Sequence, residues 1–191
     1  MTMNSAELLA PASVNFLIGD ADAGKGFVWC WLAAGVSTGD APRNVLISDH
    51  FDTTATVALR LAAAGVDPSR IHLVDGPTTD LTAAEVDAAV TGRMAGVDVG
   101  LVIVDPWNRQ EPVCRWVELA QRRNLAVLLV DYPDTVKPRD VAAAASVLTI
   151  TRPGGLGPAP RVLTESKRHG TPPVRFVIHG DDHHGRVEVT R

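Results

Sequence analysis

One eight-residue stretch constrains the fold of this 191-residue chain more than any other. It reads GDADAGKG, residues 19–26, and follows an apolar run at 14–18 that has the length of a buried strand. After it, apolar side chains recur at helical spacing over 25–36. A glycine-flanked turn between a buried strand and a helix is typical of α/β domains, in which helices cover both faces of a mainly parallel sheet.

The chemistry of this stretch favours phosphate binding, because it satisfies the pattern G-x-x-x-x-G-K. Backbone N–H groups of such a turn converge on phosphate oxygens, and the start of the helix adds a partial positive charge. Lys25 supplies a full charge to the outer phosphates. The candidate nucleotide-binding residues are therefore Gly19, Asp22, Ala23, Gly24, Lys25, Gly26 and Phe27. The alternative is a strand-to-helix turn with an accidental lysine.

Strand-like and helix-like segments alternate over the next hundred residues, which predicts parallel βαβ crossovers. Strands are expected at 44–48, 71–74, 100–104 and 125–130. Helices are expected at 53–64, 82–94 and 112–124. Short strand-like segments without long helices between them then follow, at 147–151, 161–165, 175–179 and 186–190. These predict an antiparallel C-terminal extension of the sheet.

Composition narrows the class of protein. Hydrophobic residues make up 46% and charged residues 21%, which is the balance of a folded globular chain. The formal net charge of −4 lacks the basic footprint of general nucleic-acid binders. Cys30 and Cys114 are far apart, which favours a reducing compartment over a disulfide framework. With neither a signal peptide nor a membrane-spanning run expected, we predict a cytoplasmic single domain over 1–191, with residues 1–12 as an N-terminal tail.

A second signature lies about 80 residues after the first. The segment GLVIVDP, residues 100–106, is an apolar strand that ends in an acid and resembles a Walker B segment. Asp105 would then hold Mg²⁺ at the carboxyl end of the sheet. The alternative is an aspartate that only caps a loop.

Taken together, these motifs resemble the RecA-like P-loop ATPases, and especially the RepA-like group of hexameric replicative helicases. The resemblance covers residues 14–178 and is carried by the phosphate loop, VLISDHFDTTATVALRLAAAG, LVIVDP, AVLLV and RVLTESK. It implies a RecA-like P-loop NTPase fold that binds ATP and Mg²⁺. It also implies a homo-oligomer or a partner ATPase subunit, and single-stranded DNA as a ligand. In the family a late Lys or Arg can reach a neighbouring subunit's nucleotide, which makes Lys167 a candidate catalytic residue.

Three positions depart from the family's pattern. Gly26 stands where working members carry the Ser or Thr that coordinates Mg²⁺. Phe51 stands where the family places its catalytic Glu, and Asp131-Tyr132 follows the fifth strand where a polar γ-phosphate sensor is expected. A positioned base contributes ~10²–10⁴-fold in rate, so we expect weak or lost hydrolysis.

Three functions stay open at this point. The first is an ATP-binding domain with weak or lost hydrolysis that acts in DNA replication, recombination or mobile-element maintenance. The second is an active, DNA-stimulated ATPase or helicase motor in which Asp49 or Asp52 replaces the missing Glu. The third is a non-enzymatic interaction scaffold that binds no nucleotide.

Overall fold

The computed structural model describes residues 5–74, 81–107, 109, 111–152, 160–167, 172–180 and 185–190. Strands from these residues form one sheet in the order β3-β2-β4-β5-β1-β6-β7-β8-β9. The parallel strands are β1 (Val14–Gly19), β2 (Asn44–Asp49), β3 (Ile71–Leu73), β4 (Val99–Asp105), β5 (Ala126–Asp131) and β6 (Ser146–Thr151). The antiparallel strands are β7 (Arg161–Glu165), β8 (Val174–His179) and β9 (Arg186–Thr190). The predicted antiparallel extension of a mainly parallel sheet is therefore confirmed.

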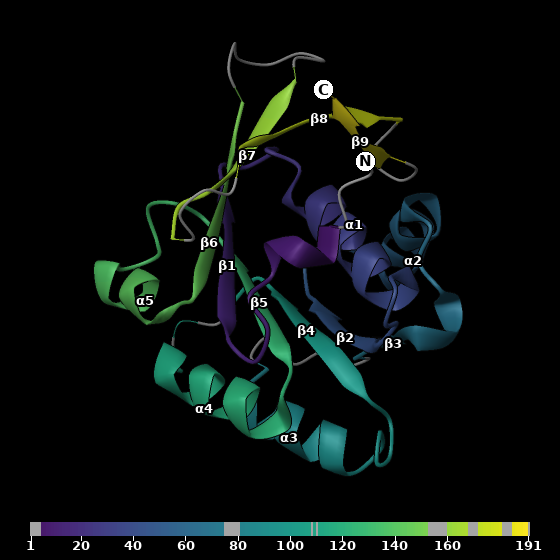
Figure 1. Ribbon diagram of the computed structural model, residues 1–191, viewed down its shortest axis with the longest axis vertical. Coiled ribbons are helices and arrows are strands. Elements are labelled where there is room, and N and C mark those ends of the chain that lie inside the picture. The colour runs from purple at the N-terminus through teal and green to yellow at the C-terminus, as the bar shows by residue number, and fades with distance from the viewer. Residues whose placement is uncertain are drawn as a thin grey trace.

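Helices cover both faces of the parallel part of the sheet, as Figure 1 shows. One face carries η1 (Ser5–Leu8), α1 (Lys25–Thr38) and α2 (Thr54–Ala64). The other face carries α3 (Ala83–Thr91), α4 (Val113–Arg123) and α5 (Pro138–Ala143). A short η2 (Pro68–Arg70) leads into β3. The layers are those of an α/β fold, as the alternation of segments predicts.

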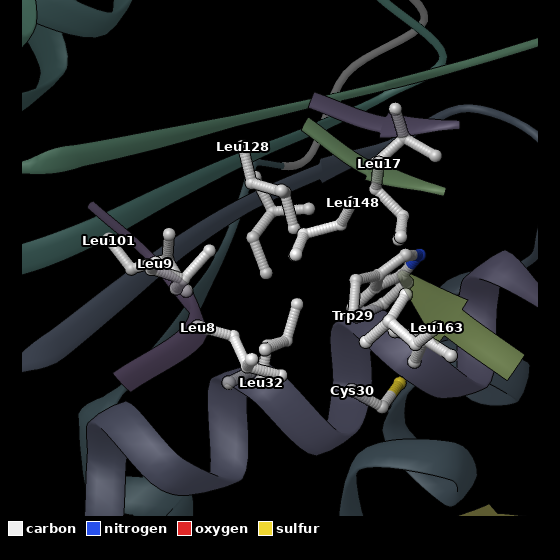
Figure 2. Packing of buried hydrophobic residues seen from close by; sticks show 14 of the residues in the cluster. Leu8, Leu9, Leu17, Trp29, Cys30, Leu32, Leu101, Leu128, Leu148 and Leu163 are labelled. Carbon is white, nitrogen blue, oxygen red and sulfur yellow. The ribbon is translucent and has the colours of Figure 1, made fainter. Parts of the chain in front are cut away.

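Each layer of helices encloses a hydrophobic core. In the core beneath α1, Trp29 and Leu32 point at the sheet, where Leu17 and Leu128 meet them (Figure 2). Central strands β1, β4 and β5 are buried along their whole length, which explains their continuous apolar sequences.

Of the N-terminal tail predicted over residues 1–12, residues 1–4 lie outside the described residues, and the part from Ser5 onward contacts the domain. Residues 1–12 are expected to be a tail, yet Leu8 and Leu9 are buried against α1 and the sheet (Figure 2). The Ser5 hydroxyl also donates to the Trp31 carbonyl at 2.8 Å. Leu8 ends a short 3₁₀ turn and Leu9 directly follows it, so the pair has no periodicity for a sequence pattern to detect, and its burial becomes visible only in three dimensions.

Capping residues set the helix boundaries as their chemistry predicts. Thr82 and Glu85 form a reciprocal capping box at the start of α3. The Thr53 side chain caps α2, and Gly65 ends that helix with a left-handed φ of 79°. Within the described ranges, no helix is both long and apolar enough to cross a bilayer.

Candidate phosphate-binding site

The loop between β1 and α1 is shaped by one glycine. Gly24 is the N-cap of α1 and has a φ of 91°, in the left-handed region that side chains rarely adopt. A Cβ atom at this position would lie 2.3 Å from the Ile178 Cδ1 atom of β8. The carbonyl of Gly24 accepts the N–H groups of Phe27 and Val28, both at 3.1 Å, which starts the helix. These two bonds do not involve the N–H groups of Lys25 and Gly26, which come first in the helix and are of the kind that an anion at a helix N-terminus can use.

The Lys25 side chain folds back onto the backbone of its own loop. Its Nζ donates to the carbonyls of Gly19 at 2.7 Å and Asp20 at 2.9 Å, and lies 3.9 Å from the centre of the Tyr132 ring. Burial lowers the pKa of the Lys25 ammonium, and nearby Asp105 partly opposes this effect. These two bonds use two of the three N–H donors of the ammonium, so one donor is left for a phosphate oxygen.

Asp105 ends β4 in a buried position, only 8% exposed. Its Oδ2 accepts a 2.9 Å hydrogen bond from the Trp29 indole, and Asp49 is its register partner on β2. Burial, together with the neighbouring Asp49 carboxylate, raises the pKa of Asp105 to about 7, although the Trp29 hydrogen bond acts in the opposite direction. The Asp105 carboxyl therefore holds its proton to a much higher pH than an ordinary aspartate does.

The residues around Asp105 do not fit a magnesium site. Gly26 offers no hydroxyl, and a Cβ atom placed on it would meet the Arg60 Nη1 atom at 3.0 Å. Mg²⁺ requires close to octahedral oxygen ligation, which a neighbouring guanidinium opposes. Among the described residues, no three His, Cys, Asp or Glu side chains gather into a set that could hold a metal ion. The assignment of Asp105 as a metal ligand therefore remains a sequence prediction without supporting donors.

The two candidate replacements for the catalytic Glu both have other partners. Asp49 accepts the backbone N–H groups of Phe51 at 2.9 Å and Asp52 at 3.2 Å, which forms a tight turn after β2. Asp52 pairs with the Arg60 guanidinium. Phe51, where the family has its Glu, is 64% exposed at the rim of the site.

The end of β5 holds a structural ion pair that sequence reasoning missed. Asp131 is buried, and its carboxylate receives two hydrogen bonds from Arg109, at 2.8 and 2.7 Å. The N–H of Tyr132 and the hydroxyl of Thr135 also donate to it, at 2.8 and 2.9 Å. The carboxylate at the expected sensor position thus organises the loop after β5.

Lys167 lies apart from the loop and caps α5. Its Nζ donates to the carbonyls of Val141 at 2.7 Å and Ala142 at 3.0 Å, and also to the carbonyl of Ala144. A cation at a helix C-terminus stabilises the last carbonyls. A contact between Lys167 and the nucleotide of a neighbouring subunit stays a prediction. For it to form, the hydrogen bonds from Nζ to the carbonyls at the end of α5 would have to break.

A cavity of about 750 Å³ opens beside the loop, at the carboxyl ends of the parallel strands. It brings together most of the predicted site residues, namely Asp22, Gly24, Lys25, Gly26, Phe27, Asp52 and Asp105. Gly19 and the buried Ala23 lie behind this lining, while Asp49 and Lys167 do not contribute to it.

Three arginines that sequence reasoning did not select also line the cavity: Arg60, Arg152 and Arg161. Arg152 directly follows β6 and Arg161 begins β7, next to the register pair Thr151 and Val162. Arg152 directly follows the strand predicted at 147–151 and Arg161 begins the strand predicted at 161–165, but neither position by itself indicates a place in the cavity.

Neither protein-family models nor curated proteins match this chain.

Proposed function

We propose that this chain is a RecA-like P-loop domain that binds ATP through residues 19–26 and hydrolyses it slowly or not at all. The observation that carries the proposal is the strand–loop–helix geometry, in which left-handed Gly24 starts α1 beside Lys25. The order of the parallel strands also supports the proposal. β1 lies between β5 and β6, and only β5 separates it from β4, so Asp105 at the end of β4 lines the same cavity as the loop.

The charges of the cavity support an anionic ligand. Its cationic side chains are Lys25, Arg60, Arg152 and Arg161, and its acids are Asp22, Asp52 and Asp105. Because the Asp105 carboxyl has a pKa of about 7, it contributes less than a full negative charge near neutral pH. The lining therefore carries a small net positive charge, and the cavity is large enough to hold a nucleotide triphosphate.

Slow hydrolysis follows from the partners of the carboxylates. Asp52 is paired with Arg60, and Asp49 is held by two N–H groups of its own loop. Neither acid has the freedom of a general base that orients water. A steady-state ATPase assay, with and without single-stranded DNA, tests this point. Robust turnover that Lys25→Ala abolishes would establish the active motor instead.

The biological setting of the proposal comes from the resemblance to RepA-like helicases. We propose a role in DNA replication, recombination or mobile-element maintenance, as a homo-oligomer or as an accessory subunit of a partner ATPase. Solution mass measured with and without ATP tests the assembly. A hexamer that forms only with ATP would favour the motor.

One observation favours a scaffold that binds no nucleotide: the Lys25 ammonium already donates hydrogen bonds to the carbonyls of Gly19 and Asp20 within its own loop. A thermal shift measurement separates the two functions. A ligand at a hundredfold excess over its Kd stabilises the folded state by ~2.7 kcal/mol. An unchanged melting temperature at millimolar ATP would support the scaffold.

A further inference from the structure

Two guanidinium groups flank the start of α1, each against one glycine of the phosphate loop. The Arg60 Nη1 atom lies 3.0 Å from the position that a Cβ atom on Gly26 would occupy. The Arg161 Nε atom lies 3.5 Å from the corresponding position on Gly24. Both arginines line the cavity beside the loop. The glycines therefore let two cations approach the site at which phosphate oxygens would meet the backbone.

Arg60 is held firmly in this place. It projects from α2, pairs with Asp52, and its guanidinium carbon lies 4.9 Å from the centre of the Phe27 ring. Its side chain is only 12% exposed. The family's metal-binding hydroxyl would stand at Gly26, so a fixed guanidinium occupies the region where Mg²⁺ would be coordinated.

Arg161 supplies the second cation. Its Nε atom is buried and makes no hydrogen bond to any residue that the structure describes. Burial lowers the pKa of this guanidinium, and the nearby Arg152 lowers it further. Two positive charges held together at a cavity wall repel each other, and a bound polyanion relieves that repulsion.

We propose that this site binds the free polyphosphate anion of a nucleotide, without a divalent cation. Arg60 takes the place of the metal on one side of the loop, and Arg161 neutralises phosphate charge on the other. A guanidinium suits this role because its planar fork donates two parallel hydrogen bonds to phosphate oxygens. The inference rests on the proposed function and specifies the ligand of the same site as metal-free ATP instead of its magnesium chelate.

The test compares ATP binding by calorimetry in EDTA and in excess MgCl₂, on the full chain. We expect saturable binding in EDTA that is as tight as binding in Mg²⁺, or tighter. Binding that requires Mg²⁺ would overturn this inference and leave the proposed function standing. The absence of binding in both buffers would overturn both.

Three variants assign the effect to the arginines. In EDTA, Arg60→Gln and Arg161→Gln should each weaken ATP binding by about 10- to 100-fold, the range for loss of a charged hydrogen bond. Arg115→Gln is the matched control, because Arg115 pairs with Glu118 on the exposed surface of α4. It should bind ATP as the unchanged protein does.

Folding of each variant is checked by its melting temperature, and Arg60→Lys, which keeps the charge beside Asp52, serves as a second variant at that position. We expect Arg60→Lys to bind ATP in EDTA more tightly than Arg60→Gln. Folded Arg60→Gln and Arg161→Gln variants with unchanged affinity in EDTA would overturn the inference.

Discussion

The indole Nε1 of Trp29 donates a 2.9 Å hydrogen bond to Oδ2 of Asp105, and this bond joins α1 to the end of β4. Both residues are buried. The bond holds the helix that follows the phosphate loop against the acid expected to hold a metal, so it stabilises the fold and positions Asp105 in the candidate site.

Replacing Trp29 by Phe should cost more stability than the loss of volume explains. The buried carboxylate loses a donor, which costs about 1–3 kcal/mol. Trp116→Phe is the matched control, because that indole is equally buried but its Nε1 makes no hydrogen bond to any described residue. Urea denaturation at pH 8 and at pH 5 measures the free energy of unfolding of both variants. The excess cost of Trp29→Phe should shrink at pH 5, where Asp105 is protonated, and an equal cost for both variants at pH 8 would contradict the account.

Asp105 should make the protein less stable as pH rises. The folded carboxyl has a pKa of about 7, against 3.8 for its ordinary value, so between these values the folded state holds a proton that the unfolded state has lost. The free energy of unfolding should therefore fall by up to about 1.4 kcal/mol per pH unit from pH 4 to pH 7. Asp105→Asn, measured by denaturation in EDTA, should remove this dependence. A variant with the same pH slope as the unchanged protein would exclude the raised pKa.

Much of the fold could be predicted from sequence, because its long elements are regular. The continuous apolar run of β4 and the capping box at Thr82 give local signals that do not depend on distant residues. The six residues of α5 and the 3₁₀ turn of η1 are too short to show a period, and neither was predicted.

The candidate site was only partly predictable for a different reason. The loop residues are adjacent in sequence, so a motif reveals them. Arg60 reaches Gly26 from α2, Arg161 reaches Gly24 from β7, and Arg109 reaches Asp131 across 22 residues. Such pairings depend on how distant elements pack, and no local pattern encodes them.

Replacing Gly24 by Ala should destabilise the protein through two separate effects. A φ of 91° strains an alanine by about 1–2 kcal/mol, and its Cβ would also collide with Ile178. Gly65→Ala isolates the first effect, because Gly65 has a φ of 79° and nothing within 4 Å of the added Cβ. In chemical denaturation, Gly24→Ala should lose more than Gly65→Ala by up to about 1 kcal/mol, because the Cδ1 atom of Ile178 is the end of a flexible, half-buried side chain that can shift. Equal losses would mean that β8 does not press on the loop.

Removing the partner of Asp131 should destabilise the loop after β5. The Asp131 side chain is fully buried, while that of Arg109 is 45% exposed, so solvent screening limits the cost of Arg109→Gln to about 1–3 kcal/mol. Arg115→Gln, which breaks an exposed pair, should cost about 0.5 kcal/mol or less. Thermal unfolding of both variants measures the difference. Indistinguishable melting temperatures would show that the Arg109 pair contributes nothing.

The central claim, that residues 19–26 bind a nucleotide, is tested most directly by calorimetric titration of ATP into the unchanged protein, Lys25→Ala and Lys137→Ala. Lys137 is the matched control, because it is exposed and its side chain makes no capping hydrogen bond at the start of α5. The account predicts saturable binding that Lys25→Ala weakens by about tenfold or more and Lys137→Ala leaves unchanged. No saturable binding at millimolar ATP, or equal binding by the Lys25→Ala variant, would contradict it.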